Sequence, residues 1–231
     1  MPLLIAALLV ASPPVPVLVE LFTSEGCSSC PPADALLARL VKAQPVPGAT
    51  VVGLSEHVDY WDSLGWKDPF SNALFTERQE DYSRVVARGR VYTPQMVVGG
   101  RVDVLGSDEL SARSAVAHAA AEPHGTLRLE RRGKGVHLAG QDLPAHADAQ
   151  VLFAVVEDGL SNQVLRGENQ GRTLSHSAVV RSLRRVGVAS GPSFELDVTP
   201  TIDPSWKSPR YVAFVQEEKS RKVLAAAELA P

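Results

Sequence analysis

The two cysteines are the residues of this chain best suited to chemistry. Cys27 and Cys30 are its only cysteines, and two serines separate them. Thiols at this spacing can form a disulfide or bind a soft metal, and the thiolate is the reactive form in both cases. A helix N-terminus favours the thiolate, because its backbone N–H groups are free and its dipole attracts an anion. We therefore assign Cys27 as the nucleophile, the more exposed and more acidic thiol, and Cys30 as the resolving thiol.

A strand, a short loop and a helix must position these cysteines. Residues 15–22 are mostly apolar, which is typical of a buried strand. Pro31 and Pro32 suit the first turn of a helix that continues with a leucine stripe, and residues 50–55 predict a second buried strand. A strand, a helix and a second strand in this order favour parallel pairing. We therefore expect the dithiol at the carboxyl end of a strand in an α/β sheet, where such sheets place their sites.

The rest of the chain divides into two parts by its pattern. Two further helices and two further strands are expected at residues 72–88, 107–121, 92–98 and 102–105. Beyond Gly125 the pattern changes to short alternating strands separated by turn residues, one of them expected at 175–184, which is typical of a small antiparallel sandwich or barrel. The fold class predicted is α/β, with a first domain at 15–122 followed by a smaller β-rich, sandwich-like domain at 125–231.

Composition and charge exclude several classes of protein. The 231 residues carry a net charge of −3, so no overall basic field attracts nucleic acid or anionic lipid. The apolar run at 3–11 is too short to span a bilayer, although residues 1–14 could be a secretory signal segment. We expect no membrane span, no nucleic-acid partner and a periplasmic or secreted location, with a cytoplasmic location as the alternative.

The segment after the second predicted strand is rich in aromatic and polar residues and has three possible roles. Tyr60 and Trp61 could form a substrate-binding wall near the cysteines. His57 could join the two thiolates as a ligand for Cu(I), which suits sulfur and imidazole. The third possibility is that the aromatic side chains simply pack over the sheet.

A proline at the start of a strand also needs an explanation. Pro94 follows Thr93 about sixty residues after the dithiol, where an ordinary strand would avoid proline. A cis peptide bond in a constrained turn would explain its position, and so would a trans proline at a sheet edge.

Three motifs resemble a bacterial family of secreted, functionally uncharacterised, thioredoxin-like proteins. They are ELFTSEGCSSCPPAD at 20–34, HVDYWD at 57–62 and YTPQMVV at 92–98. The order of the predicted elements also resembles the thioredoxin core. The resemblance implies that Pro94 is cis and that it faces the dithiol, with Thr93, across a substrate groove.

The same resemblance supplies a candidate for proton transfer. Thioredoxins carry a buried acid on the strand before the dithiol, and Glu20 is the nearest match here. It would exchange a proton with Cys30. The alternative is a glutamate that faces solvent on an edge strand.

The leading functional hypothesis is a thiol–disulfide oxidoreductase. It would exchange disulfides with a protein client and a redox partner protein, and it would need no cofactor besides the Cys27–Cys30 disulfide. One alternative is a periplasmic copper chaperone that binds Cu(I) with these cysteines and His57; the other is a non-catalytic interaction module. The β-rich part is expected to recruit partners and to contribute no residue to the redox step, with Arg172 and His176 as turn and packing residues.

Overall fold

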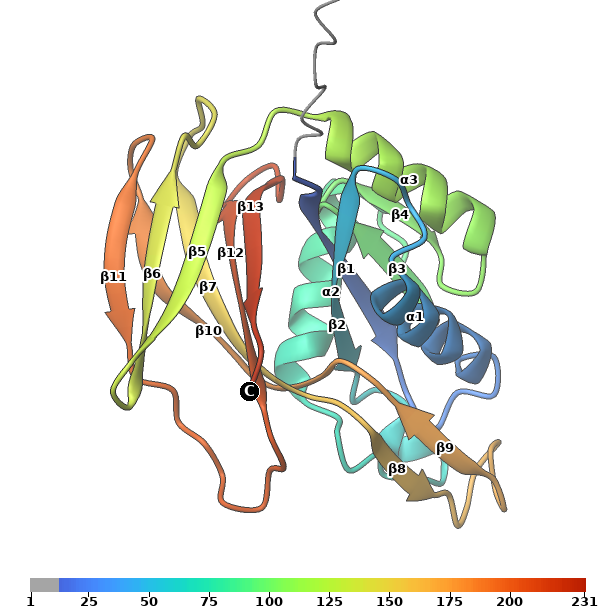
Figure 1. The fold of residues 1–231 in the computed structure, drawn as a ribbon. Coiled ribbons are helices and arrows are strands. Elements are labelled where there is room, and N and C mark those ends of the chain that lie inside the picture. The colour runs from blue at the N-terminus through green and yellow to red at the C-terminus, as the bar shows by residue number, and fades with distance from the viewer. Residues whose placement is uncertain (1–12) are drawn as a thin grey trace, which may run out of the picture.

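A computed structural model describes residues 13–231 as one large mixed sheet with three helices and two smaller sheets (Figure 1). The helices are α1 (Pro31–Ala43), α2 (Ala73–Val85) and α3 (Glu109–Ala121), with a short 3-10 helix, η1, at Asp62–Leu64. Most of the possible signal segment at 1–14 lies outside the described residues.

The strands form three sheets. The eight-stranded sheet has the order β13 (Val223–Leu229), β12 (Arg210–Glu217), β7 (Ala149–Glu157), β10 (Val179–Ala189), β2 (Ala49–His57), β1 (Val15–Thr23), β3 (Gln95–Val98) and β4 (Val102–Leu105). The three-stranded sheet has the order β11 (Phe194–Val198), β6 (Gly135–Gln141) and β5 (Thr126–Arg132). The remaining pair is β8 (Leu160–Gln163) with β9 (Thr173–His176).

Helix α1 forms where its prolines and leucines predict it. Cys30 is its N-cap and the two prolines occupy its first positions, where no backbone N–H donor is needed. Its apolar stripe is buried against the sheet, and it approaches β2 closely at Gly53. A Cβ at Gly53 would lie 2.5 Å from Val41 and 3.2 Å from Leu37, both on α1. The helix is therefore held tightly against the strands that lead into the site.

Strand pairing brings three connections to one edge of the sheet. β1 and β2 are parallel, so their last residues, Thr23 and His57, lie side by side. β3 runs antiparallel to β1 and pairs its first residue, Gln95, with Phe22. The loops after β1 and β2 and the loop before β3 therefore meet at this edge.

The second half of the chain extends this sheet. β10 pairs in parallel with β2 at Val179 and Ser55, and β7, β12 and β13 follow as antiparallel strands. β7 is buried on both faces because alternate residues enter different cores. Leu152 packs in the core shared with α1 and α3, whereas Phe153 packs against the three-stranded sheet. The expected boundary near residues 122–125 falls in the connection between α3 and β5.

A bend separates two strands that the sequence pattern predicts as one. Ala178 lies between β9 and β10 with a φ of 59°, and the backbone oxygen of this residue accepts a hydrogen bond from Ser55 N–H at 2.7 Å. β10 therefore joins the large sheet, while β9 turns away to pair with β8. We call residues 160–176 the β8–β9 arm; Figure 1 shows it beside the end of the sheet that carries the cysteine loop.

Candidate functional site

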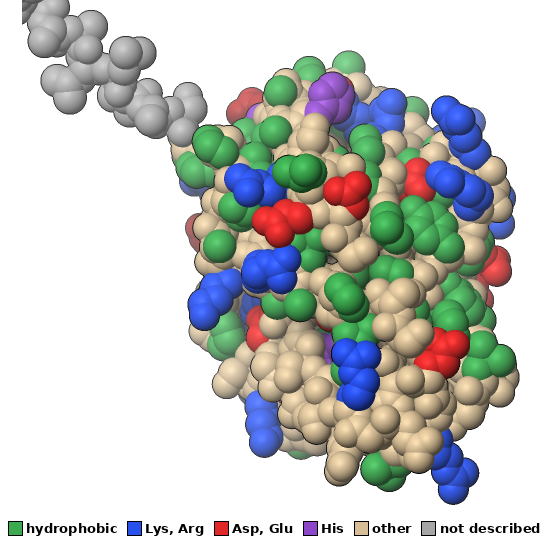
Figure 2. Space-filling model, turned by 90° about the vertical axis from the view of Figure 1, so that its right-hand side faces the viewer, with side chains coloured by type: hydrophobic (Ala, Val, Ile, Leu, Met, Phe, Trp, Pro, Cys, Tyr) green, Lys and Arg blue, Asp and Glu red, His purple; other side chains and the backbone are tan. Residues whose placement is uncertain are grey.

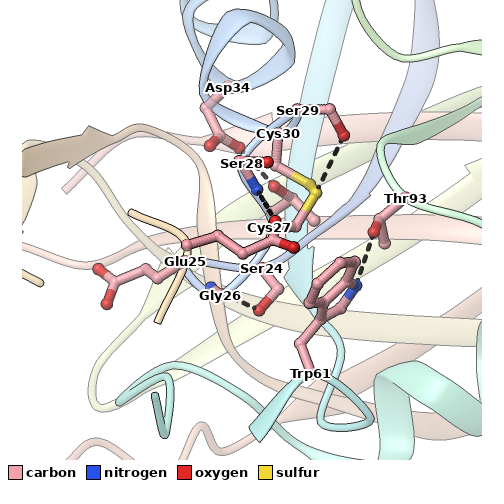
Figure 3. Close-up of a disulfide and its surroundings, with 12 residues drawn as sticks. Ser24, Glu25, Gly26, Cys27, Ser28, Ser29, Cys30, Asp34, Trp61 and Thr93 are labelled. Carbon is pink, nitrogen blue, oxygen red and sulfur yellow. Dashed lines mark hydrogen bonds between the residues drawn. A yellow bond between two sulfur atoms is a disulfide. The ribbon is translucent and has the colours of Figure 1, made fainter. Parts of the chain in front are cut away.

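The cysteines form a disulfide at the entrance to α1 (Figure 3). The Cα atoms of Cys27 and Cys30 are 5.4 Å apart, and Cys27 Sγ lies 3.3 Å from Ser29 Oγ. Both cysteines are 0% exposed, so in this disulfide form Cys27 is not the more accessible residue. The two serines between them are exposed at the surface. A partner therefore meets the serines of this turn before it meets a sulfur.

The residues expected around the dithiol do gather beside it. Trp61 Nε1 donates a hydrogen bond to Thr93 Oγ1 at 2.8 Å, and the Thr93–Pro94 bond is cis. A Cβ at Gly26 would lie 3.2 Å from Trp61 Cβ, which places this tryptophan against the cysteine loop (Figure 3). Trp61 and Thr93 thus form one wall next to the disulfide.

Pro94 and Tyr60 complete this wall. A Cβ at Gly106 would touch both Pro94 at 2.9 Å and Ala33 at 3.1 Å, so Pro94 lies close to the first turn of α1. Tyr60 is 36% exposed and donates to Gln79 Oε1 at 3.1 Å. Its partial burial raises the pKa of the Tyr60 hydroxyl, against the effect of its hydrogen bonds.

The β8–β9 arm binds the cysteine loop directly, whereas the β-rich part was expected only to recruit partners. The buried Asn169 donates from Nδ2 to the backbone oxygens of Glu25 and Cys27, both at 2.9 Å. Arg172 donates to Asn169 Oδ1 at 2.7 Å and so fixes the orientation of this amide. Arg172 therefore supports the cysteine loop, and the β-rich part contributes side chains to the site.

Glu25 connects the arm to the loop after β2. Its carboxylate accepts hydrogen bonds from Trp66 Nε1 at 2.9 Å, Asn162 Nδ2 at 3.0 Å and His176 Nε2 at 3.1 Å. Its backbone N–H donates to Asp68 Oδ2 at 2.8 Å. The side chain extends away from the disulfide (Figure 3). Glu25 thus anchors the cysteine loop on the side that faces away from the sulfurs.

A buried histidine–aspartate pair lies next to Glu25. His57 Nδ1 is 2.7 Å from Asp68 Oδ2, and both side chains are fully buried. Burial opposes the charged imidazole, but the Asp68 charge and hydrogen bond prevail and raise the pKa of His57. Burial likewise opposes the Asp68 charge, and His57 with two backbone N–H groups lowers the pKa of Asp68. Asp68 therefore engages Nδ1 of His57, whereas the buried Nε2 has no hydrogen-bond partner among the described residues.

Asp34 is the acid nearest to the dithiol along the helix, and the sequence interpretation missed it. It stands one turn after Cys30 on α1, accepts a hydrogen bond from Thr23 Oγ1 at 2.8 Å and lies 3.8 Å from His176 Nδ1. Burial raises its pKa, although His176, His57 and Thr23 act in the opposite direction. The four-residue spacing from Cys30 was the signal that could have identified it.

Glu20 is a buried acid whose side-chain partners belong to α2. It is 0% exposed, so it does not face solvent. Arg78 Nε donates to it at 2.6 Å and the Tyr82 hydroxyl also donates to it, and both partners belong to α2. Arg78 also reaches Gln216 on β12 at 3.1 Å. Among the described residues, the hydrogen-bond partners of Glu20 therefore tie α2 to the sheet and include neither cysteine.

No group of three or more His, Cys, Asp or Glu side chains suited to a metal ion occurs within residues 13–231. In the same residues no helix is long and apolar enough to cross a membrane. Basic and acidic side chains are interspersed on the face shown in Figure 2.

The fold and the site define a mixed α/β protein with a CxxC disulfide at one edge of its main sheet. The chain belongs to the family described as "Protein of unknown function (DUF1223)", whose model matches residues 18–216. The expectation of a functionally uncharacterised family is thereby confirmed.

A solved structure supports this fold. The crystal structure of an Agrobacterium tumefaciens protein from the Northeast Structural Genomics Consortium is 28% identical, with a TM-score of 0.75. The match covers 95% of this chain and 96% of that chain. A comparison with curated proteins gave no match.

Proposed function

We propose that this protein is a thiol–disulfide oxidoreductase that works through Cys27 and Cys30 in a thioredoxin-like arrangement. The observation that carries the proposal is the position of the disulfide. It lies at the entrance to α1 and at the sheet edge where Trp61, Thr93 and Pro94 form a wall beside it. A disulfide in this position is set up for exchange with a partner, and it also fits an oxidising compartment such as the periplasm.

The reaction is a pair of thiol–disulfide exchanges. The Cys27 thiolate attacks a client disulfide, forms a mixed disulfide and releases one client thiolate, which takes up a proton. The Cys30 thiolate then attacks Cys27 Sγ, which restores the Cys27–Cys30 disulfide and releases the second client thiol. Two electrons pass to the client, and a redox partner protein returns them. The reverse sequence oxidises a client dithiol.

We assign the proton transfer with Cys30 to Asp34 instead of Glu20. Asp34 lies in the first turn of α1, directly after the N-cap Cys30, and contacts Thr23 and His176. Its raised pKa, caused first by burial, lets this carboxyl hold a proton at a higher pH than an exposed aspartate does. Glu20, in contrast, is an ion-pair partner of Arg78.

Both cysteines are buried, so exchange requires a local opening of the turn. The exposed serines between the cysteines and the arm contacts at Cys27 are the parts that must move. We expect the protein to exchange faster with a flexible client than with a rigid one.

Reduction of insulin by dithiothreitol, with and without the protein, tests the proposal. The native protein should accelerate reduction, Cys27→Ser should abolish the acceleration, and Cys30→Ser should accumulate a mixed disulfide through Cys27. If the Cys27→Ser variant still accelerates insulin reduction, the proposal is refuted. Anaerobic titration with Cu(I) examines the copper-binding alternative, which requires tight binding that both Cys27→Ser and His57→Ala weaken.

A further inference from the structure

Glu168 in the β8–β9 arm caps the turn between the two cysteines. Its Oε2 accepts a hydrogen bond from the backbone N–H of Ser28 at 2.9 Å, across 140 residues of sequence. Hydrogen bonds from the Ser28 side chain and backbone lower the pKa of Glu168, so this carboxyl is ionised at neutral pH. An exposed surface glutamate thus reaches the residue directly after Cys27.

This contact opposes the features that stabilise a thiolate at Cys27. Backbone N–H groups at the start of α1 and the helix dipole attract negative charge. Glu168 occupies the Ser28 N–H and places its own negative charge next to Cys27. A nearby like charge disfavours ionisation of a thiol, whereas it has no such effect on a neutral disulfide.

We propose that Glu168 is a positioning residue that favours the disulfide over the dithiol by destabilising the Cys27 thiolate. The second half of the chain would then set the reduction potential of the cysteines, which deepens the proposed function. The other ionisable groups of the site have partners of their own. His57 pairs with Asp68, His176 holds Glu25, and Thr23 donates to Asp34. They remain in place when Glu168 is changed.

The measured reaction is exchange with glutathione. One protein disulfide and two glutathione thiols give one protein dithiol and one glutathione disulfide, so atoms and electrons balance. Two unit charges about 6 Å apart in surroundings close to bulk water interact strongly enough to change an equilibrium about threefold, and this change applies here at a pH at which the Cys27 thiol is ionised. Threefold corresponds to about 14 mV, since tenfold is 29.6 mV for two electrons.

The test compares Glu168→Gln, which keeps an acceptor oxygen for Ser28, with Glu168→Asp, which keeps the charge. Glu130→Gln is the control, because it removes an exposed carboxylate from β5, which lies away from the cysteine loop and the β8–β9 arm (Figure 1). Glu168→Gln should move the glutathione equilibrium about threefold toward the dithiol. It should also lower the pKa of the Cys27 thiol, which is measured from thiolate absorbance in the Cys30→Ser variant. Glu168→Asp should stay near the native value, and the difference should shrink in 1 M salt, where the Debye length is about 3 Å.

An unchanged equilibrium and thiol pKa in Glu168→Gln would overturn the inference. A shift equal to that of Glu130→Gln, or a raised thiol pKa, would do the same. The equilibrium with glutathione can be measured whether or not the protein reduces insulin. If the protein does not accelerate insulin reduction but Glu168→Gln shows the expected shift, the oxidoreductase proposal is rejected and this inference stands.

Discussion

Removal of the Asn169 side chain tests whether the arm holds the cysteine loop. In Asn169→Ala, the backbone oxygens of Glu25 and Cys27 both lose a donor at 2.9 Å, and Arg172 loses its acceptor. Asn169 is 0% exposed, so water does not readily replace the lost amide.

The size of the effect follows from these bonds. A hydrogen bond contributes about 0.5–1.5 kcal/mol net, and a buried polar group without a partner costs about 1–3 kcal/mol. After the substitution the Cys27 carbonyl still accepts from Cys30 N–H, whereas the Glu25 carbonyl has lost the Asn169 donor. One lost bond and one buried carbonyl without its partner together lower the free energy of unfolding by about 2–4 kcal/mol. For a chain of this length each kcal/mol lowers Tm by about 2–4 °C, so we expect a decrease of about 4–16 °C.

Thermal unfolding followed by circular dichroism measures this decrease. Gln170→Ala is the matched control, because its side chain is exposed and adjacent in the same loop. The control should unfold within about 2 °C of the native protein, as surface substitutions usually do. If Asn169→Ala unfolds as the control does, the arm does not hold the loop and our account of the site is wrong.

Two further predictions concern buried acids. The stability supplied by the raised pKa of His57 is complete below pH 6.5 and is lost as pH rises through its folded value. The urea midpoint of the native protein should therefore fall between pH 6 and 9, and this fall should be absent in Asp68→Asn. A pH profile that is the same in both proteins would contradict the pairing. Asp34, whose pKa burial raises, contributes stability below pH 3.8 that is lost as pH rises through its folded value. Asp34→Asn should therefore be at least as stable as the native protein at pH 7, while Cys30 should resolve mixed disulfides more slowly; normal resolution would remove Asp34 from the mechanism.

Local patterns explain which parts of the fold the sequence could predict. Pro31, Pro32 and the leucine stripe act within one helix, so they indicate α1 without knowledge of its surroundings. The same holds for Asn72, which caps α2 by accepting from Leu74 N–H. The helix expected at residues 107–121 begins at Glu109, and Asp108, not Ser107, caps it by accepting from Ser111 N–H. Both residues suit this role, so composition alone could not separate them.

Contacts between distant residues explain what the sequence could not predict. Asn169 and His176 reach the cysteine loop from 142 and 151 residues away, and no periodicity records such a meeting. The division between β9 and β10 depends on a left-handed Ala178, a conformation that alanine rarely adopts. The resemblance implies an acid on the strand before the dithiol, where Glu20 is buried with Arg78, and therefore gives no indication of Asp34 on the helix.

The separation between the cysteines and Asn169 also has a consequence during protein synthesis. A ribosome adds about 5–20 residues each second, so the 142 residues from Cys27 to Asn169 take about 7–28 s. During that interval both cysteines have been made, but the side chain that holds the Cys27 carbonyl has not. A nascent chain in an oxidising environment can therefore form or exchange its disulfide while the cysteine loop is still free. Once the β8–β9 arm has been translated, Asn169 can hold that loop in place.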